Sequence, residues 1–157
     1  KMKSKGLSPN EITYSSLIEA LCKNNEEKQA LTILEWALKD GIYGFCFQEE
    51  KGLLKLDLHN LSVYVARTMI RHVLMKLGWE PAMSEGSVEM KNVAVVNKTV
   101  IIVTGQGHHV NSDGSRGVLR EEIESFITQD LQLEATVPHA NPGRLMVTIP
   151  VRTQEEE

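Results

Sequence analysis

Two polar clusters stand at the ends of apolar segments, and their side chains are of the kinds that catalyse phosphate chemistry. Asp57 and His59 close a segment, residues 53–59, in which leucines alternate with polar residues. A glycine-containing stretch, Thr104-Gly-Gln-Gly-His-His109, follows the apolar run Val100–Val103. A carboxylate and imidazoles exchange protons near neutral pH, and glycines let backbone N–H groups approach an anion. The spacing therefore indicates a site that binds phosphate and performs acid–base chemistry.

Cleavage of a phosphodiester requires an activated nucleophile, stabilisation of charge on the phosphoryl oxygens and protonation of the leaving group. In this interpretation His59 and His109 are base and acid, and Asp57 orients a water or ligates Mg²⁺ or Mn²⁺ as a lone carboxylate. For RNA, the 2′-hydroxyl is an internal nucleophile that needs no metal. The other residues expected to contact nucleic acid here are Lys55, Thr104, Gly105, Gln106, Gly107, His108, Arg116, Arg120 and Arg144.

Plainer interpretations of the same residues remain open. Asp57 and His59 can be a surface pair that support each other on an exposed sheet face. The glycine stretch can be a tight turn between strand and helix, with its histidines in water. Arg67 and Arg71 lie on the polar side of a predicted helix, and we interpret them as a solvated helix face.

The apolar periodicity of residues 53–150 predicts an α/β unit of order β-α-β-α-β-β. Its first two strands should be parallel and joined by a right-handed crossover, and two helices should cover one face of a four-stranded sheet. The expected elements are strands at 53–59, 100–103, 134–138 and 144–150 and helices at 62–77 and 118–127, with Ser62 as N-cap and Gly78 as helix end. Residues 93–96 are a short extra strand or the run-in to the central strand.

Parallel strands end at the same edge of a sheet, which is where such sheets bind ligands. The residues predicted to meet at that edge are Asp57, His59, Gly105, Gly107 and His109. The uncovered face of the sheet is expected to carry Lys55, Asp57, His59, Arg144 and Thr148.

Residues 11–42 have the helical spacing of a hairpin of two helices, with a turn at Asn24-Asn25 and an end at Gly41. We expect Leu17, Leu21, Leu31 and Leu34 to pack this hairpin onto its neighbour. The predicted organisation is therefore the end of one hairpin and a complete one at 1–45, a connector at 46–52, the α/β domain at 53–150 and a disordered tail at 151–157.

The hairpin carries a specific pattern. Lys5-Gly-Leu-Ser-Pro-Asn-Glu-Ile-Thr-Tyr-Ser-Ser-Leu-Ile-Glu-Ala-Leu-Cys-Lys23, followed by Gln29-Ala-Leu and by Gly41, closely resembles a pentatricopeptide repeat (PPR). The resemblance implies binding of single-stranded RNA, with Ser15 and Phe45 as the pair that reads one base and Asn10 closing the pair of the preceding repeat. Phe45 departs from the polar residue usual at its position. A plain hairpin that covers the next domain, or a terminal cap of the array, is the alternative.

Residues 53–150 also resemble a known domain. Leu56-Asp-Leu-His59, with Thr104-Gly-Gln-Gly107, His109 and Leu119-Arg120 downstream, is similar to an Smr (small MutS-related) domain. The resemblance implies a fold like the C-terminal domain of translation initiation factor 3, nucleic-acid binding and, in several members, endonuclease activity. PPR repeats fused to a C-terminal Smr domain resemble an organellar class of plants and algae, so we expect the chloroplast rather than the mitochondrion. Asn60 stands where the family often has glycine, and Val110 where serine is common.

The composition narrows the choice of function. The chain has 157 residues and a formal charge of −4, so any nucleic-acid site must be a local patch. It has no apolar run of membrane-spanning length, and Cys22 and Cys46 match no metal-binding spacing. Three hypotheses follow: an RNA endonuclease guided by the repeats, a non-catalytic RNA- or DNA-binding adaptor, and a small enzyme that holds a nucleotide phosphate at Gly105–Gly107. We expect a monomer with no membrane contact and no small-molecule cofactor.

Overall fold

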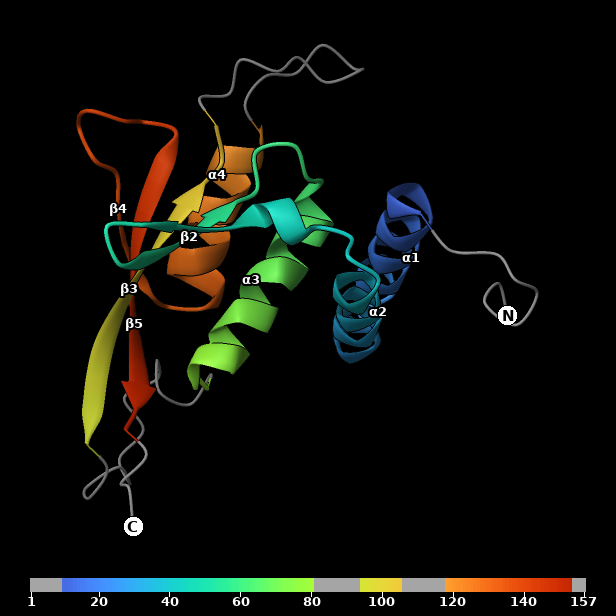
Figure 1. The fold of residues 1–157 in the computed structure, drawn as a ribbon, viewed down its shortest axis with the longest axis horizontal. Coiled ribbons are helices and arrows are strands. Elements are labelled where there is room, and N and C mark those ends of the chain that lie inside the picture. The colour runs from blue at the N-terminus through green and yellow to red at the C-terminus, as the bar shows by residue number, and fades with distance from the viewer. Residues whose placement is uncertain (1–9, 81–93, 106–117, 154–157) are drawn as a thin grey trace.

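A computed structural model describes residues 10–80, 94–105 and 118–153. The chain folds into a sheet, a layer of two helices on one face of that sheet, and a helical hairpin packed outside those helices (Figure 1). The helices are α1 (Glu11–Lys23), α2 (Glu27–Lys39), α3 (Val63–Leu77) and α4 (Val118–Ser125), the last continued by a π-helical turn, Phe126–Asp130. The strands are β1 (Phe47–Glu50), β2 (Leu53–Asp57), β3 (Val95–Val103), β4 (Glu134–Thr136) and β5 (Arg144–Arg152).

The sheet has five strands in the order β1-β2-β3-β5-β4. The predicted element order within residues 53–150 is confirmed as β2-α3-β3-α4-β4-β5, and β2 and β3 are parallel, with Leu54 opposite Val100. Strand β5 runs antiparallel to β3 and places Arg144 opposite Val103. Within the predicted segment 93–96, Val95 and Val96 belong to β3 and do not form a separate strand.

Two of the predictions about the sheet are wrong. Residues 47–50, predicted as part of a connector, form the edge strand β1, so the sheet has five strands and not four. Charged side chains are common on edge strands, so Gln48-Glu-Glu50 has the composition of a linker although it forms a strand, which ends before the turn at Lys51. The tail predicted at 151–157 begins too early, because β5 continues to Arg152 and Val151 is buried.

Helices α3 and α4 cover one face of the sheet with a continuous apolar core. Leu56, Ile102 and Val147 point into this core from three neighbouring strands, and Met69 and Phe126 fill it from the helices. Helix α3 begins and ends as predicted. The Ser62 hydroxyl accepts a hydrogen bond from the Val65 N–H at 3.3 Å, and Gly78 ends the helix with φ +91°.

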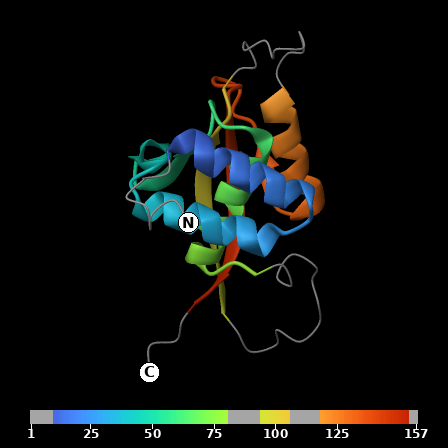
Figure 2. The ribbon, with the colours of Figure 1, turned by 90° about the vertical axis from the view of Figure 1, so that its right-hand side faces the viewer.

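The hairpin of α1 and α2 lies against α3, on the side away from the sheet (Figure 2). Tyr14, Ile18 and Leu34 are buried and belong to the same core as the α3 side chains. The prediction that Leu17 contributes to this packing is wrong, because its side chain is 45% exposed. Spacing of four residues places Tyr14 and Ile18 on the buried side of α1, and Leu17 lies off that side.

Candidate nucleic-acid interface

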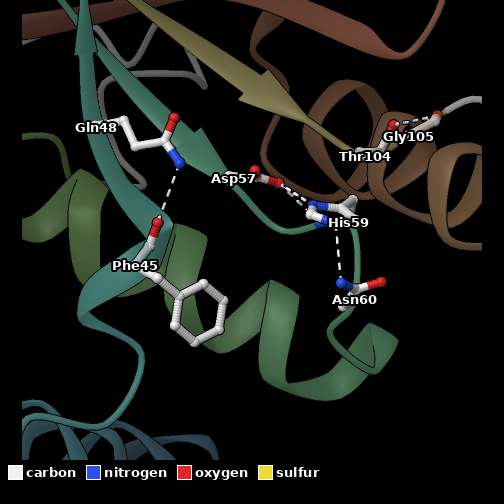
Figure 3. A network of polar contacts seen from close by, with 7 residues as sticks. All are labelled: Phe45, Gln48, Asp57, His59, Asn60, Thr104 and Gly105. Carbon is white, nitrogen blue, oxygen red and sulfur yellow. Dashed lines mark hydrogen bonds and ion pairs between the residues drawn. The ribbon is translucent and has the colours of Figure 1, made fainter.

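Three polar side chains form a chain of hydrogen bonds at the carboxyl end of β2 (Figure 3). The Asp57 carboxylate lies 2.5 Å from His59 Nδ1 and also accepts the His59 backbone N–H at 3.2 Å. On the other side of the ring, the Asn60 side-chain amide nitrogen is 2.8 Å from His59 Nε2. With a proton on Nδ1 the ring donates to Asp57, so Nε2 is left as the basic nitrogen. His59 is therefore arranged as a general base that Asp57 orients, and its basic nitrogen lies within hydrogen-bond distance of the Asn60 amide.

The end of β3 lies beside this chain of hydrogen bonds. Gly105 has φ +78°, and a Cβ atom added to it would be 3.5 Å from the Cβ of His59. The predicted meeting of the two strand ends is therefore confirmed for Asp57, His59 and Gly105. We call the group formed by Asp57, His59, Asn60 and Gly105 the strand-end cluster. The predicted residues Gln106, Gly107, His108, His109 and Arg116 lie outside the described residues.

The backbone at this edge differs from the prediction in one respect. The N–H groups of Thr104 and Gly105 both donate to the Gly143 carbonyl, at 3.0 and 3.2 Å. The Gly105 N–H, which was predicted to hold a phosphate, is thus used within the fold. The Thr104 side chain is buried, and its hydroxyl donates to the Gly105 carbonyl at 3.4 Å. The N–H groups of Thr104 and Gly105 are therefore already bonded within the fold and are not free to bind a phosphate.

Two of the predicted phosphate-binding cations are paired with one carboxylate. Arg144 donates hydrogen bonds to both oxygens of Glu50, one of them at 3.1 Å, and the Lys55 ammonium lies 3.8 Å from the same carboxylate. The hydrogen bonds from Arg144 hold the pKa of the Glu50 carboxyl below its ordinary value, and the bonded Glu50 raises the pKa of Arg144. A carboxyl with a lowered pKa loses its charge only below its ordinary range, so this ion pair persists at neutral pH.

Glu50→Gln should therefore strengthen RNA binding, since it releases Lys55 and Arg144 from a competing anion. Each cation that gains a phosphate contact should steepen the slope of log K against log salt by about 0.7. Binding measured by fluorescence anisotropy over a salt series checks both effects. Glu49→Gln is the matched control, because it makes the same charge change on the other side of strand β1. Equal effects of the two variants would show that Glu50 acts only through net charge.

Arg67 and Arg71 are not a solvated helix face, contrary to the sequence interpretation. The Arg67 guanidinium is 2.8 Å from Glu122 and lies over the Phe126 ring, 5.4 Å from its centre. Arg71 lies 5.1 Å from the centre of the same ring and 3.4 Å from Glu27 of α2. Both side chains therefore pack between helices, and Arg71 joins the hairpin to the layer beneath it.

The residues predicted to read a base have separate local roles. Asn10 caps α1, because its side-chain oxygen accepts the Thr13 N–H at 3.0 Å. Ser15 is half-buried on α1, and its hydroxyl donates to the Ile12 carbonyl at 3.1 Å. Phe45 is 57% exposed, in a 3₁₀ turn that precedes β1. Arg120, which is predicted to contact nucleic acid through its charge and not to read a base, is half-buried in the first turn of α4.

Sequence reasoning missed three participants. Asn60 is one of them, and its position directly after His59 is the signal that an amide is available there. Glu50 lies 94 residues from Arg144, and no local pattern links them. The Gly143 carbonyl that accepts the Thr104 and Gly105 N–H groups lies immediately before β5, and no local sequence pattern indicates that contact.

The strand-end cluster contains few side chains that could bind the predicted metal ion. The strand-end cluster supplies one carboxylate, and one of its oxygens already bonds both the ring and the backbone N–H of His59. Within the described ranges no three His, Cys, Asp or Glu side chains gather as a metal-binding group. Asp57 therefore has an orienting contact with His59, and a metal ion at this carboxylate stays a prediction. In the same part of the chain, no helix combines the length and apolar character needed to cross a bilayer.

Comparison with known proteins identifies one segment. Residues 5–35 match the family model of the PPR repeat. Within the described part of the chain this segment covers α1 and most of α2, the two antiparallel helices expected of a helical repeat. A search of curated proteins found no match. The match confirms the PPR part of the resemblance and suggests that the chain binds RNA.

Proposed function

We propose that this chain is an RNA-binding protein in which the PPR hairpin helps to select the site and the strand-end cluster contacts and cleaves the RNA backbone. The observation that carries the proposal is the Asp57–His59 hydrogen bond of 2.5 Å beside Gly105, downstream of a segment that matches the PPR model. The resemblance of residues 53–150 to an Smr domain supports the same assignment. It also supports an organellar setting, with the chloroplast ahead of the mitochondrion.

The proposed chemistry uses the side chains and the RNA itself. A 2′-hydroxyl replaces the Asn60 amide at His59 Nε2 and gives its proton to that nitrogen, while Asp57 stabilises the resulting imidazolium. The 2′-oxygen then bonds to the adjacent phosphorus as the bond to the 5′-oxygen breaks. The leaving 5′-oxygen takes a proton from an acid, for which His109 is the candidate from the sequence. The products are a 2′,3′-cyclic phosphate and a 5′-hydroxyl.

A second function, RNA or DNA binding without cleavage, is favoured by other observations. Asn60 covers the basic nitrogen of His59, the Gly105 N–H is bonded to Gly143, and Glu50 neutralises two cations. These contacts occupy the general base, the backbone N–H group and the two cations that cleavage would need. An adaptor that protects or remodels a transcript needs affinity for the nucleic acid, but it needs no side chain oriented as a general base.

The experiment that separates the two functions uses labelled single-stranded and structured RNA with the full chain, in Mg²⁺ and in EDTA. We expect saturable binding that weakens about threefold when the salt concentration doubles, as for two or three phosphate contacts. Cleavage to a cyclic phosphate that survives EDTA supports the proposed chemistry, whereas cleavage only with Mg²⁺ returns Asp57 to a metal-binding role. Binding without products supports the adaptor, and the absence of binding at low salt contradicts both functions.

A further inference from the structure

Phe45 is an exposed aromatic residue on a well-anchored turn. It is the middle residue of the 3₁₀ turn Gly44–Cys46, and its side chain is 57% exposed although Tyr43 and Cys46 beside it are buried. The Cys46 N–H donates to the Tyr43 carbonyl at 3.0 Å, and the Gln48 side chain donates to the Phe45 carbonyl at 3.2 Å. These bonds fix the backbone, so the ring is held in water by a rigid support.

The turn lies next to the strand-end cluster. Phe47 is opposite Leu56 in the antiparallel pair of β1 and β2, so the residues before Phe47 run alongside the residues after Leu56. Burial raises the pKa of the Cys46 thiol to about 12, and the Asp57 carboxylate nearby acts in the same direction. Figure 3 shows the Phe45 ring directed away from the strands.

An aromatic ring beside a polar edge suits one class of ligand in particular. A nucleotide of single-stranded RNA has an apolar base face next to a charged phosphate, and bases stack on exposed aromatic side chains. Trp36 is also exposed, at 51%, but it lies within helix α2 rather than beside the strand-end cluster. Isolated exposed apolar residues are ordinary on protein surfaces, so it is the position of Phe45 that carries the argument.

We infer that Phe45 is a stacking platform for a nucleobase of single-stranded RNA, whose phosphate faces the strand-end cluster. This inference rests on the proposed function. Phenylalanine has no side-chain donor or acceptor, so the platform accepts any base and does not read its Watson–Crick edge. It therefore places the RNA backbone at the cluster without adding sequence choice, and it joins the hairpin to the α/β part of the chain in a single RNA path.

The test compares two RNAs of equal length, one with all its bases and one that lacks every base but keeps every phosphate. Phe45→Ala should weaken binding of the full chain to the intact RNA by about 5- to 150-fold, the measured range for one stacked base. Its binding to the fully abasic RNA should be unchanged. Phe45→Trp should bind intact RNA at least as tightly as the wild type, and Phe45→Leu should behave like the alanine variant. Changing the identity of the stacked nucleobase should change the affinity of the wild-type chain only slightly.

Controls make the result decisive. Trp36→Ala removes an exposed aromatic of similar exposure on α2 and should leave both affinities unchanged. Circular dichroism should give the same unfolding midpoint for Phe45→Ala and wild type, since the ring is mostly exposed. An equal loss on intact and abasic RNA, or normal binding by Phe45→Ala or Phe45→Leu, overturns the stacking platform alone. If the wild type binds neither RNA, the proposed function fails as well.

Discussion

Under the proposed endonuclease function, Asp57→Ala is expected to slow single-turnover RNA cleavage by about 100-fold or more while leaving RNA affinity within a few-fold of wild type. The carboxylate holds the His59 ring at 2.5 Å and also bonds the His59 backbone, so its removal leaves the base without its orienting partner. A carboxylate near a phosphate repels the substrate in the ground state, and its removal should not weaken binding. Cleavage and equilibrium binding are measured at the same salt concentration.

Two further variants test the reason for this effect. Asp57→Asn keeps the size of the side chain and removes its charge, so it should also cleave slowly if the charge stabilises the imidazolium. Asp130→Ala removes an exposed carboxylate at the end of the turn Phe126–Asp130 and should cleave at the wild-type rate. If Asp57→Ala cuts as fast as wild type, the endonuclease role of this residue is wrong and the adaptor becomes the first hypothesis.

The central α/β elements could be predicted because their signals are local. Alternating leucines give β2, the N-cap and glycine ends give α3, and the rule that parallel strands end at one edge brings His59 beside Gly105. Each of these inferences needs only a few neighbouring residues and a general rule of chain geometry. The Smr resemblance remains a resemblance, since the match to known families covers residues 5–35.

The missed features depend on contacts that are distant in sequence. Strand β1 is charged because it lies at a sheet edge, and only its pairing with β2 distinguishes it from a linker. The bond between Glu50 and Arg144 and the bonds from Thr104 and Gly105 to Gly143 are set by the folded sheet. These contacts decide how many cations and amides are available to RNA. The sequence therefore predicted which residues gather at the site better than it predicted their electrostatic state.

Leu34→Ala in the hairpin is expected to destabilise the whole chain, by about 2–5 kcal/mol in the free energy of unfolding. Leu34 is fully buried and belongs to the core that continues into α3. Two polar contacts also join the hairpin to α3. Cys22 Sγ lies 3.5 Å from the Thr68 hydroxyl, and the Arg71 guanidinium lies 3.4 Å from the Glu27 carboxylate. A hairpin that shares its core with α3 should unfold together with it, so a peptide of residues 1–44 should show no cooperative melting.

Unfolding of the two parts of the chain can be followed by tryptophan fluorescence. The chain contains two, and Trp79 is buried at the end of α3 whereas Trp36 lies on α2. In a Trp36→Phe background the fluorescence of Trp79 reports the α/β part, and Leu34→Ala should lower its urea midpoint although Leu34 lies in the hairpin. Leu17→Ala is the control on the same hairpin, and with a 45% exposed side chain it should change stability by less than about 1 kcal/mol. A Trp79 transition that does not move with Leu34→Ala would mean that the hairpin unfolds independently, and the PPR segment would then be a separate unit tethered to the α/β part.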